Sequence, residues 1–151
     1  MEETVTYQKV VNRLAPCGID CERCVRYDKG TVKRLATELG AALEGFERMA
    51  ARSVDRVPAL KDYDRFAEIL GFFRGSDCPG CREQGCPLPI CAARDCYREK
   101  GVDFCFQCDE YPCERNQYPQ IMVERWRAVN DRMREVGPEQ YYRESLEKPR
   151  Y

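Results

Sequence analysis

Apolar side chains recur every three or four residues along much of the chain. Over residues 31–50 this stripe predicts an amphipathic helix, formed by Val32, Leu35, Ala36, Leu39, Leu43, Phe46 and Ala50. Pro58 then marks a linker, because proline lacks an N–H and disfavours helix at the residue before it. A second helix is predicted from about residue 62 to 74, with Gly75 as its end. Both stripes are interpreted as core-facing.

The last third of the chain carries the longest helical pattern. Its apolar positions are Tyr118, Met122, Trp126, Val129, Met133 and Val136. We predict Asn116 as the N-cap of this helix, Gly137 as its end, and a final short helix beginning at Gly137-Pro138 and running through Leu146. A shorter helix is predicted over residues 89–101, with a proline near its first turn and a glycine at its end. Only residues 4–8 alternate as a strand would, so the predicted fold class is mainly α with little β.

The composition adds a second element to this picture. The chain has 151 residues, of which 34% are charged, and it contains 11 cysteines and no histidine. Its length predicts one domain over 1–151. Within it we distinguish an N-terminal cysteine knuckle (17–24), a helical pair (31–75), a cysteine-rich module (76–115) and C-terminal helices (116–151). The fold is therefore predicted to be a helical body stapled by a cysteine-rich, metal-binding insert.

Disulfides do not account for these cysteines. A secreted disulfide scaffold favours a short chain, an even cysteine count and an export signal. The N-terminus instead begins with acidic Glu2 and Glu3 and lacks the apolar stretch of a signal peptide. No segment has the apolar length that spans a bilayer, so we expect a soluble, cytoplasmic protein. Free thiols in a reducing compartment are open to oxidation, whereas metal-bound thiolates are occupied.

The cysteine spacing indicates metal ligation. The candidate ligands form three runs: Cys17-x3-Cys21-x2-Cys24, then Cys78-x2-Cys81-x4-Cys86-x4-Cys91-x4-Cys96, then Cys105-x2-Cys108-x4-Cys113. In the first pair of the middle run, Pro79 presets one turn residue and Gly80 accepts positive φ at the next, which brings both sulfurs to one side. Three CxxC pairs in one short chain favour zinc-knuckle-like turns that bind two or more Zn²⁺ ions.

The ligand count leaves several arrangements open. Two closed four-thiolate sites use eight cysteines and leave three, whereas three sites need a non-sulfur ligand as well. Spare cysteines can equally be small buried apolar side chains. Cys91 and Cys96 are five residues apart, about 140° around a helix, so they either serve different metals or straddle the start of the helix.

Two other uses of cysteine pairs were weighed. A thioredoxin-like redox pair needs a βαβ setting that the helical patterns do not provide. An iron–sulfur cluster is the main alternative, because the Cys17-x3-Cys21-x2-Cys24 spacing matches that of radical enzymes with a [4Fe–4S] cluster. The chain is too short for the barrel of those enzymes. All-sulfur tetrahedral ligation does not separate zinc from iron.

The motif order resembles a family of small prokaryotic cysteine-rich proteins, known only as a domain of unknown function and presumed to bind zinc. The matching motifs are CGIDCERC, CPGC, CAARDC, VDFCFQCDEYPCE and the closing EVGPEQYYRESLEK. The resemblance implies a zinc-binding fold. It implies no activity.

Other function classes receive less support. Without histidine, the usual acid–base and Cys-His routes are missing, and no nucleotide-binding motif is present, so we lean against an enzyme. Residues 76–115 hold five Lys/Arg and eight Asp/Glu, and zinc–thiolate sites would make this region more negative, so nucleic acid is an unlikely partner. We expect Arg23, Arg82, Arg94 and Arg98 to offset metal-bound thiolates. The expected role is structural zinc in a protein-interaction or accessory module, whose protein partner the sequence does not identify.

Overall fold

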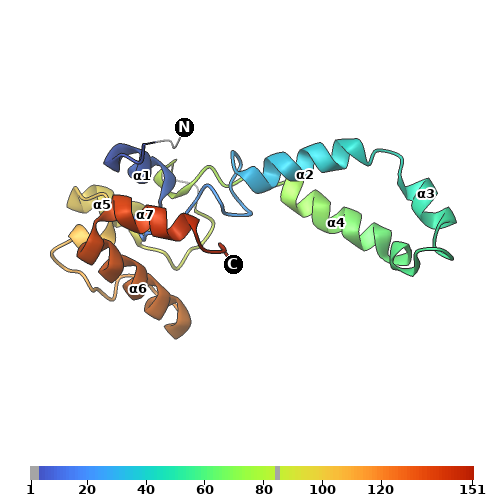
Figure 1. Ribbon diagram of the computed structural model, residues 1–151. Coiled ribbons are helices and arrows are strands. Elements are labelled where there is room, and N and C mark those ends of the chain that lie inside the picture. Colours follow the sequence, from blue (N-terminus) through green and yellow to red (C-terminus); the bar gives the residue numbers. More distant parts are fainter. Residues whose placement is uncertain (1–3, 84–85) are drawn as a thin grey trace. The chain divides into compact units, whose positions relative to one another are not determined.

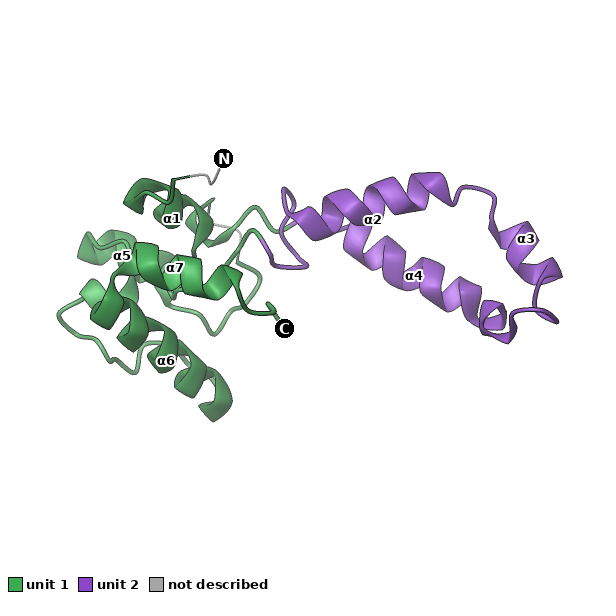
Figure 2. Ribbon diagram, in the orientation of Figure 1, with its two compact units in different colours: residues 1–22, 78–151 green, residues 23–77 purple. Residues whose placement is uncertain are grey.

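The computed structural model describes residues 4–83 and 86–151, and the chain forms two compact units (Figures 1 and 2). Unit 1, here called the body, comprises residues 1–22 and 78–151. Unit 2, here called the arm, comprises residues 23–77 and contains the predicted helical pair. The prediction of a mainly α fold is confirmed, because the named elements are helices and the β structure of the described residues is limited to isolated bridge residues, such as the bridge between Leu14 and Asp20.

The arm consists of α2 (Thr31–Ala42), α3 (Glu47–Arg52), the 3-10 helix η1 (Pro58–Asp62) and α4 (Tyr63–Arg74). The single helix predicted over residues 31–50 is therefore wrong. Gly45 has φ of +78°, a left-handed conformation that interrupts an α-helix, and it lies between α2 and α3. The prediction for α4 is confirmed, with Gly75 directly after its last residue.

Helices α2 and α4 form an antiparallel hairpin. Lys33 near the start of α2 donates a hydrogen bond of 2.8 Å to the carbonyl of Ser76, just beyond the end of α4. The apolar side chains buried in this hairpin and in the adjoining α3 are few: Ala36, Leu70 and Ala50. The arm therefore has little interior of its own.

The body contains α1 (Tyr7–Arg13), α5 (Ala93–Lys100), α6 (Gln120–Val136) and α7 (Pro138–Leu146), with the short 3-10 helices η2 (Cys81–Glu83) and η3 (Cys105–Gln107). Helix α7 packs against α1 and α6, and η3 packs against α6. One apolar cluster joins these elements through Val10, Leu14, Phe104, Met133 and Tyr142. None of the helices within residues 4–83 and 86–151 combines the length and apolar character needed to cross a bilayer.

Two local predictions in the body are wrong. Residues 4–8 are not a strand: Thr6 caps α1 by accepting a hydrogen bond from the backbone N–H of Lys9 at 3.3 Å. Asn116 is not the N-cap of α6, a position that Pro119 occupies. Its side-chain oxygen instead accepts the backbone N–H groups of Ala92 and Ala93, at 2.8 and 3.2 Å, at the start of α5.

The ends of α5 and α6 follow the sequence more closely. Helix α5 begins at Ala93, later than predicted, and ends at Gly101, which has φ of +62°. Gly137 separates α6 from α7 with φ of +84°, and Pro138 is the first residue of α7. The predicted boundary at this glycine–proline pair is confirmed.

Gly18 allows the cysteine-bearing N-terminal segment to approach α6. It has φ of +87°, and a Cβ atom there would lie 2.3 Å from Cγ1 of Val129 and 2.7 Å from Cε of Met133. We expect Gly18→Ala to lower the free energy of unfolding by roughly 2 to 5 kcal/mol, from left-handed backbone strain plus overpacking. Denaturant titration measures this loss. Gly101→Ala is the matched control: it has positive φ but no described atom within 4 Å, so the expected cost is about 1 kcal/mol. Equal losses in the two variants would contradict the close approach.

Candidate metal centres of the body

Four cysteines from separate segments of the body come together as a first thiol group: Cys21, Cys81, Cys86 and Cys91. Each thiol lies close enough to the next to shift its pKa: Cys21 beside Cys81, Cys81 beside Cys86, and Cys86 beside Cys91. Cys81 follows the Pro-Gly turn, in which Gly80 has φ of +98° as the sequence predicts. The group thus joins the N-terminal segment to the segment that leads into α5.

The thiols of the first group share protons unevenly. Hydrogen bonds from neighbouring thiols lower the pKa of Cys86, and the hydrogen bond from Cys81 lowers the pKa of Cys21 to about 7. The pKa of Cys81 is raised by its side-chain contacts with the sulfurs of Cys21 and Cys86, and that of Cys91 is raised by its contact with Cys86. Cys21 and Cys86 are therefore the thiols of this group that lose a proton most readily.

Two further side chains border the first thiol group. The Tyr118 hydroxyl lies 2.9 Å from Sγ of Cys91, a distance at which either atom can donate. Cys17 is 5% exposed, and burial raises its pKa to about 11. Because a buried thiol with this pKa is neutral, Cys17 behaves as a small apolar side chain packed beside the group.

The second thiol group surrounds a cavity of about 20 Å³, which is room for one water molecule or small ion. Its four cysteines are Cys96, Cys105, Cys108 and Cys113. Cys96 projects from α5, and the other three come from η3 and the loop that follows it. Burial raises the pKa of Cys96 and raises that of Cys105 to about 12.

Trp126 supplies a donor to this second cavity. The ring of this α6 residue is 5% exposed, and its Nε1–H is buried with no hydrogen-bond acceptor among the described residues. The same N–H nevertheless lowers the pKa of Cys105, against the larger effect of burial. The indole N–H thus faces the Cys105 sulfur without forming a complete hydrogen bond. A buried N–H without a full hydrogen bond can stabilise a neighbouring sulfur that carries negative charge.

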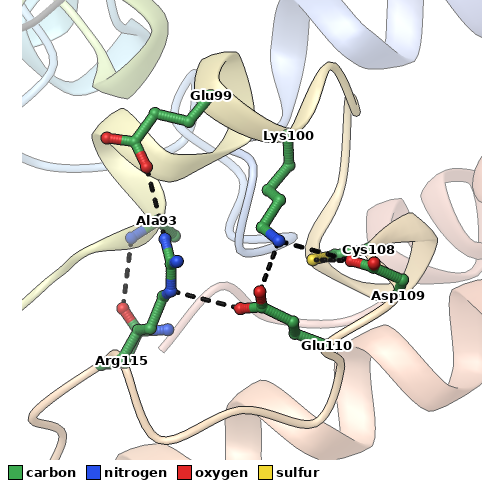
Figure 3. Close-up of polar contacts among 8 residues, drawn as sticks. Ala93, Glu99, Lys100, Cys108, Asp109, Glu110 and Arg115 are labelled. Carbon is green, nitrogen blue, oxygen red and sulfur yellow. Dashed lines mark hydrogen bonds and ion pairs between the residues drawn. The ribbon is translucent and has the colours of Figure 1, made fainter.

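Charged side chains form a network next to Cys108 of the second thiol group (Figure 3). Lys100 on α5 pairs with Glu110 and lies 3.5 Å from Asp109, next to Cys108. Arg115 contacts Glu110 and Glu99, each at 3.3 Å. These exposed pairs add little stability individually. They tie the loop that carries Cys108 and Cys113 to the helix that carries Cys96.

The arginines expected to offset thiolates have mixed positions. Arg94 donates to the Cys86 carbonyl at 3.3 Å, and its charge contributes to the lowered pKa of Cys86. Arg82 instead donates to the backbone carbonyls of Leu14 and Asp103, at 3.0 and 2.7 Å, and Arg98 donates to the Arg82 carbonyl. The expectation for Arg82 and Arg98 is therefore corrected: each cross-links backbone segments. Lys100 and Arg115 are the cationic side chains that line the second cavity.

The predicted ligands are thus distributed unequally. Eight of the 11 cysteines fall into the two thiol groups, and Cys17 packs beside the first. Cys24 belongs to the arm, Cys78 begins the second segment of the body, and we assign neither to a group. All 11 are free thiols. Within residues 4–83 and 86–151, no set of three or more His, Cys, Asp or Glu side chains is arranged so that it could hold a metal ion as it stands.

Tyr118 and Trp126 were missed by sequence reasoning as neighbours of the thiols. Both occupy apolar positions in the periodic pattern that leads into α6, and both also line a neighbouring cavity of about 100 Å³ beside Cys17. Their polar atoms meet cysteines 27 and 21 residues away in the sequence (118 − 91 and 126 − 105). A helical pattern tells which face is buried but not which distant side chain lies against it.

Comparison with known proteins adds a family. Residues 13–118, which include both thiol groups, match the family model described as "Protein of unknown function (DUF3795)". The chain belongs to the DUF3795 family. The matched segment begins in α1 and ends at Tyr118, so α6 and α7 lie beyond it. Neither the curated proteins nor the solved structures yielded a match.

Proposed function

We propose that the body binds two Zn²⁺ ions, one at each thiol group, and that these ions are structural. The observation that carries this proposal is the sorting of eight cysteines into two separate groups of four. Four thiolates are the full ligand set of a closed structural zinc site. Zinc in such a site supplies cross-linking and folding free energy, with no open position for a substrate.

The surroundings of the second group fit a charged zinc–thiolate centre. A Zn²⁺ ion with four thiolates carries a net charge of about −2, which needs nearby donors and cations. The Trp126 N–H, which lacks an acceptor among the described residues, faces Cys105, and Lys100 and Arg115 line the same cavity. Such donors and cations would not stabilise a neutral, dry cavity, but they do stabilise negatively charged sulfur.

Both groups require a local rearrangement, because neither holds its cysteines, among the described residues, as a metal needs them. In the first group each sulfur lies beside the next, so binding requires the side chains to turn until all four sulfurs face one point. Such rotation costs little compared with structural zinc binding, which supplies on the order of 10 kcal/mol. Once Cys91 is a zinc-bound thiolate, the Tyr118 hydroxyl 2.9 Å away is the donor of that hydrogen bond.

Elemental analysis of anaerobically purified full chain tests the proposal. We expect two zinc ions per chain and a colourless protein. If the protein instead contains iron with labile sulfide and shows visible charge-transfer absorption, the bound group is an iron–sulfur cluster and not zinc. Both outcomes are chemically open, because four thiolates suit either metal. Absence of both metals from protein expressed with excess zinc would contradict metal binding altogether.

The role of Trp126 can be tested separately. We expect Trp126→Phe, which keeps the ring but removes the N–H, to weaken zinc at the second group about 10- to 100-fold, the usual effect of losing a donor to a metal ligand. Competition with a chromophoric zinc chelator measures this affinity. Tyr111→Phe is the control, since its hydroxyl bonds to Asp131, at 2.9 Å, and to the carbonyl of Arg127, whereas its ring contacts Trp126. Equal zinc affinity in the wild type and Trp126→Phe would contradict a role for the indole N–H in stabilising the metal site.

A further inference from the structure

The last part of the second thiol group is fastened to the segment that carries the last cysteine of the first. Asn116 lies three residues after Cys113 and lines the second cavity. Its side-chain oxygen accepts the backbone N–H groups of Ala92 and Ala93, at 2.8 and 3.2 Å. These two residues directly follow Cys91 of the first group. One amide side chain therefore contacts the surroundings of both groups.

Two backbone hydrogen bonds run between the same parts of the chain. The N–H of Gln117 donates to the carbonyl of Ile90, the residue before Cys91, at 3.0 Å. The N–H of Cys105 in the second group donates to the carbonyl of Pro16 at 2.9 Å. That carbonyl belongs to the N-terminal segment, which also carries a cysteine of the first group. The backbones that position the two groups are thus joined directly.

Two aromatic side chains form another connection. The Tyr118 hydroxyl lies 2.9 Å from Sγ of Cys91 in the first group. The Trp126 N–H faces Cys105 in the second group. The two rings pack edge to face, with their centroids 6.4 Å apart. They therefore link a sulfur of the first group to a sulfur of the second.

The loop between η3 and α6 depends on these contacts for its order. Residues 108–119 form no helix or strand, and none of them is buried. Two cysteines of the second group, Cys108 and Cys113, lie in this loop, which ends in the residues that contact the first group. Fixing such a loop costs conformational entropy. A zinc ion that fixes the loop lowers this cost for the next ion.

We propose that zinc binding at one thiol group raises the zinc affinity of the other, and that residues 116–118, here called the bridge, carry this coupling. The coupling rests on the proposed function, since it concerns the same two ions. Zinc at the second group fixes the loop and the bridge, which then hold the segment around Cys91. Because coupling between sites is reciprocal, each ion changes the affinity of the other by the same factor, which we expect to be about 10 to 100.

Competition with a chromophoric zinc chelator, on the full chain under reducing conditions, measures the coupling. In the wild type it gives the product of the two stepwise zinc affinities. Cys108→Ser and Cys81→Ser each leave one thiol group complete, so they give the affinity of each group while the other is empty. Coupling makes the wild-type product about 10 to 100 times larger than the product of these two single-group affinities.

The outcomes separate the coupling from the proposed function. Equal products would overturn the coupling and leave two independent structural zinc sites. A wild type that binds fewer than two zinc ions would overturn both the coupling and the proposed function.

Asn116→Ala tests the bridge, because it removes the acceptor of two N–H groups beside Cys91. With the three measurements repeated in this background, the ratio of the two products should fall about three- to ten-fold. Asn116→Asp keeps an acceptor oxygen and should restore the ratio. Gln117→Ala is the matched control: it keeps the backbone N–H that bonds to Ile90, so the ratio should stay at the wild-type value.

The ratio distinguishes a bridge from a residue that only stabilises α5. Such a residue would weaken zinc binding equally whether or not the other group is filled, so an unchanged ratio in Asn116→Ala would overturn the bridge. Tyr118→Phe decides the question if Asn116→Ala fails to fold, because it removes only the hydroxyl beside Cys91. It should lower the ratio about three-fold, and an unchanged ratio there would overturn the bridge as well.

Discussion

Cys108→Ser is expected to lose one of the two zinc ions and to unfold the segment from α5 to the start of α6. The hydroxyl of serine does not replace a thiolate as a zinc ligand, and a structural site contributes on the order of 10 kcal/mol, as much as the net stability of many domains. Cys81→Ser should lose the other ion instead, because Cys81 belongs to the first thiol group. Zinc content and thermal melting, measured on both variants, check this result.

The chain provides its own controls for these substitutions. Cys24→Ser removes a thiol of the arm, and Cys17→Ser removes a buried thiol outside both groups. We expect both variants to keep two zinc ions, although Cys17→Ser should lower the melting temperature because it buries a hydroxyl in an apolar site. Loss of zinc from Cys24→Ser, or full zinc content in Cys108→Ser, would contradict the grouping.

Chelation of the metal is expected to affect the two units differently. Removal of zinc should speed amide hydrogen exchange over residues 86–116 by more than about 100-fold, because that segment has many cysteines and few aliphatic contacts. The arm helices α2 and α4 should keep the exchange rates of the untreated protein, since they hold no thiol group. Exchange measured peptide by peptide with mass spectrometry separates the two units. Equal acceleration in both units, or none in either, would contradict a metal that stabilises the body alone.

Most helices could be predicted from the sequence, because their apolar faces and terminating residues are local. The end of α4 at Gly75, the end of α5 at Gly101 and the boundary between α6 and α7 are all encoded by glycine and proline. The division of 31–50 into α2 and α3 was missed because the apolar stripe continues across Gly45. The pattern records burial, not the local φ that interrupts the helix.

The grouping of the cysteines required the structure. Spacing alone suggested that Cys21 and Cys24 act together, yet Cys21 joins Cys81 and Cys24 lies in the arm. For Cys91 and Cys96 the five-residue separation left two options open, different metals or a position on either side of the helix start. In the structure Cys91 precedes α5, Cys96 lies within it, and the two fall in different thiol groups. Asn116 shows the limit of local reasoning, because its side-chain oxygen accepts the N–H groups of Ala92 and Ala93, which lie 24 and 23 residues earlier at the start of α5.

X-ray absorption at the zinc edge tests the central claim most directly. For the full chain loaded with two zinc ions, we expect a shell of four sulfur atoms per zinc at about 2.3 Å and no short zinc–zinc vector, since the two thiol groups are separate. A first shell with nitrogen or oxygen, fewer than four sulfurs per zinc, or two zinc ions sharing bridging thiolates would contradict the account.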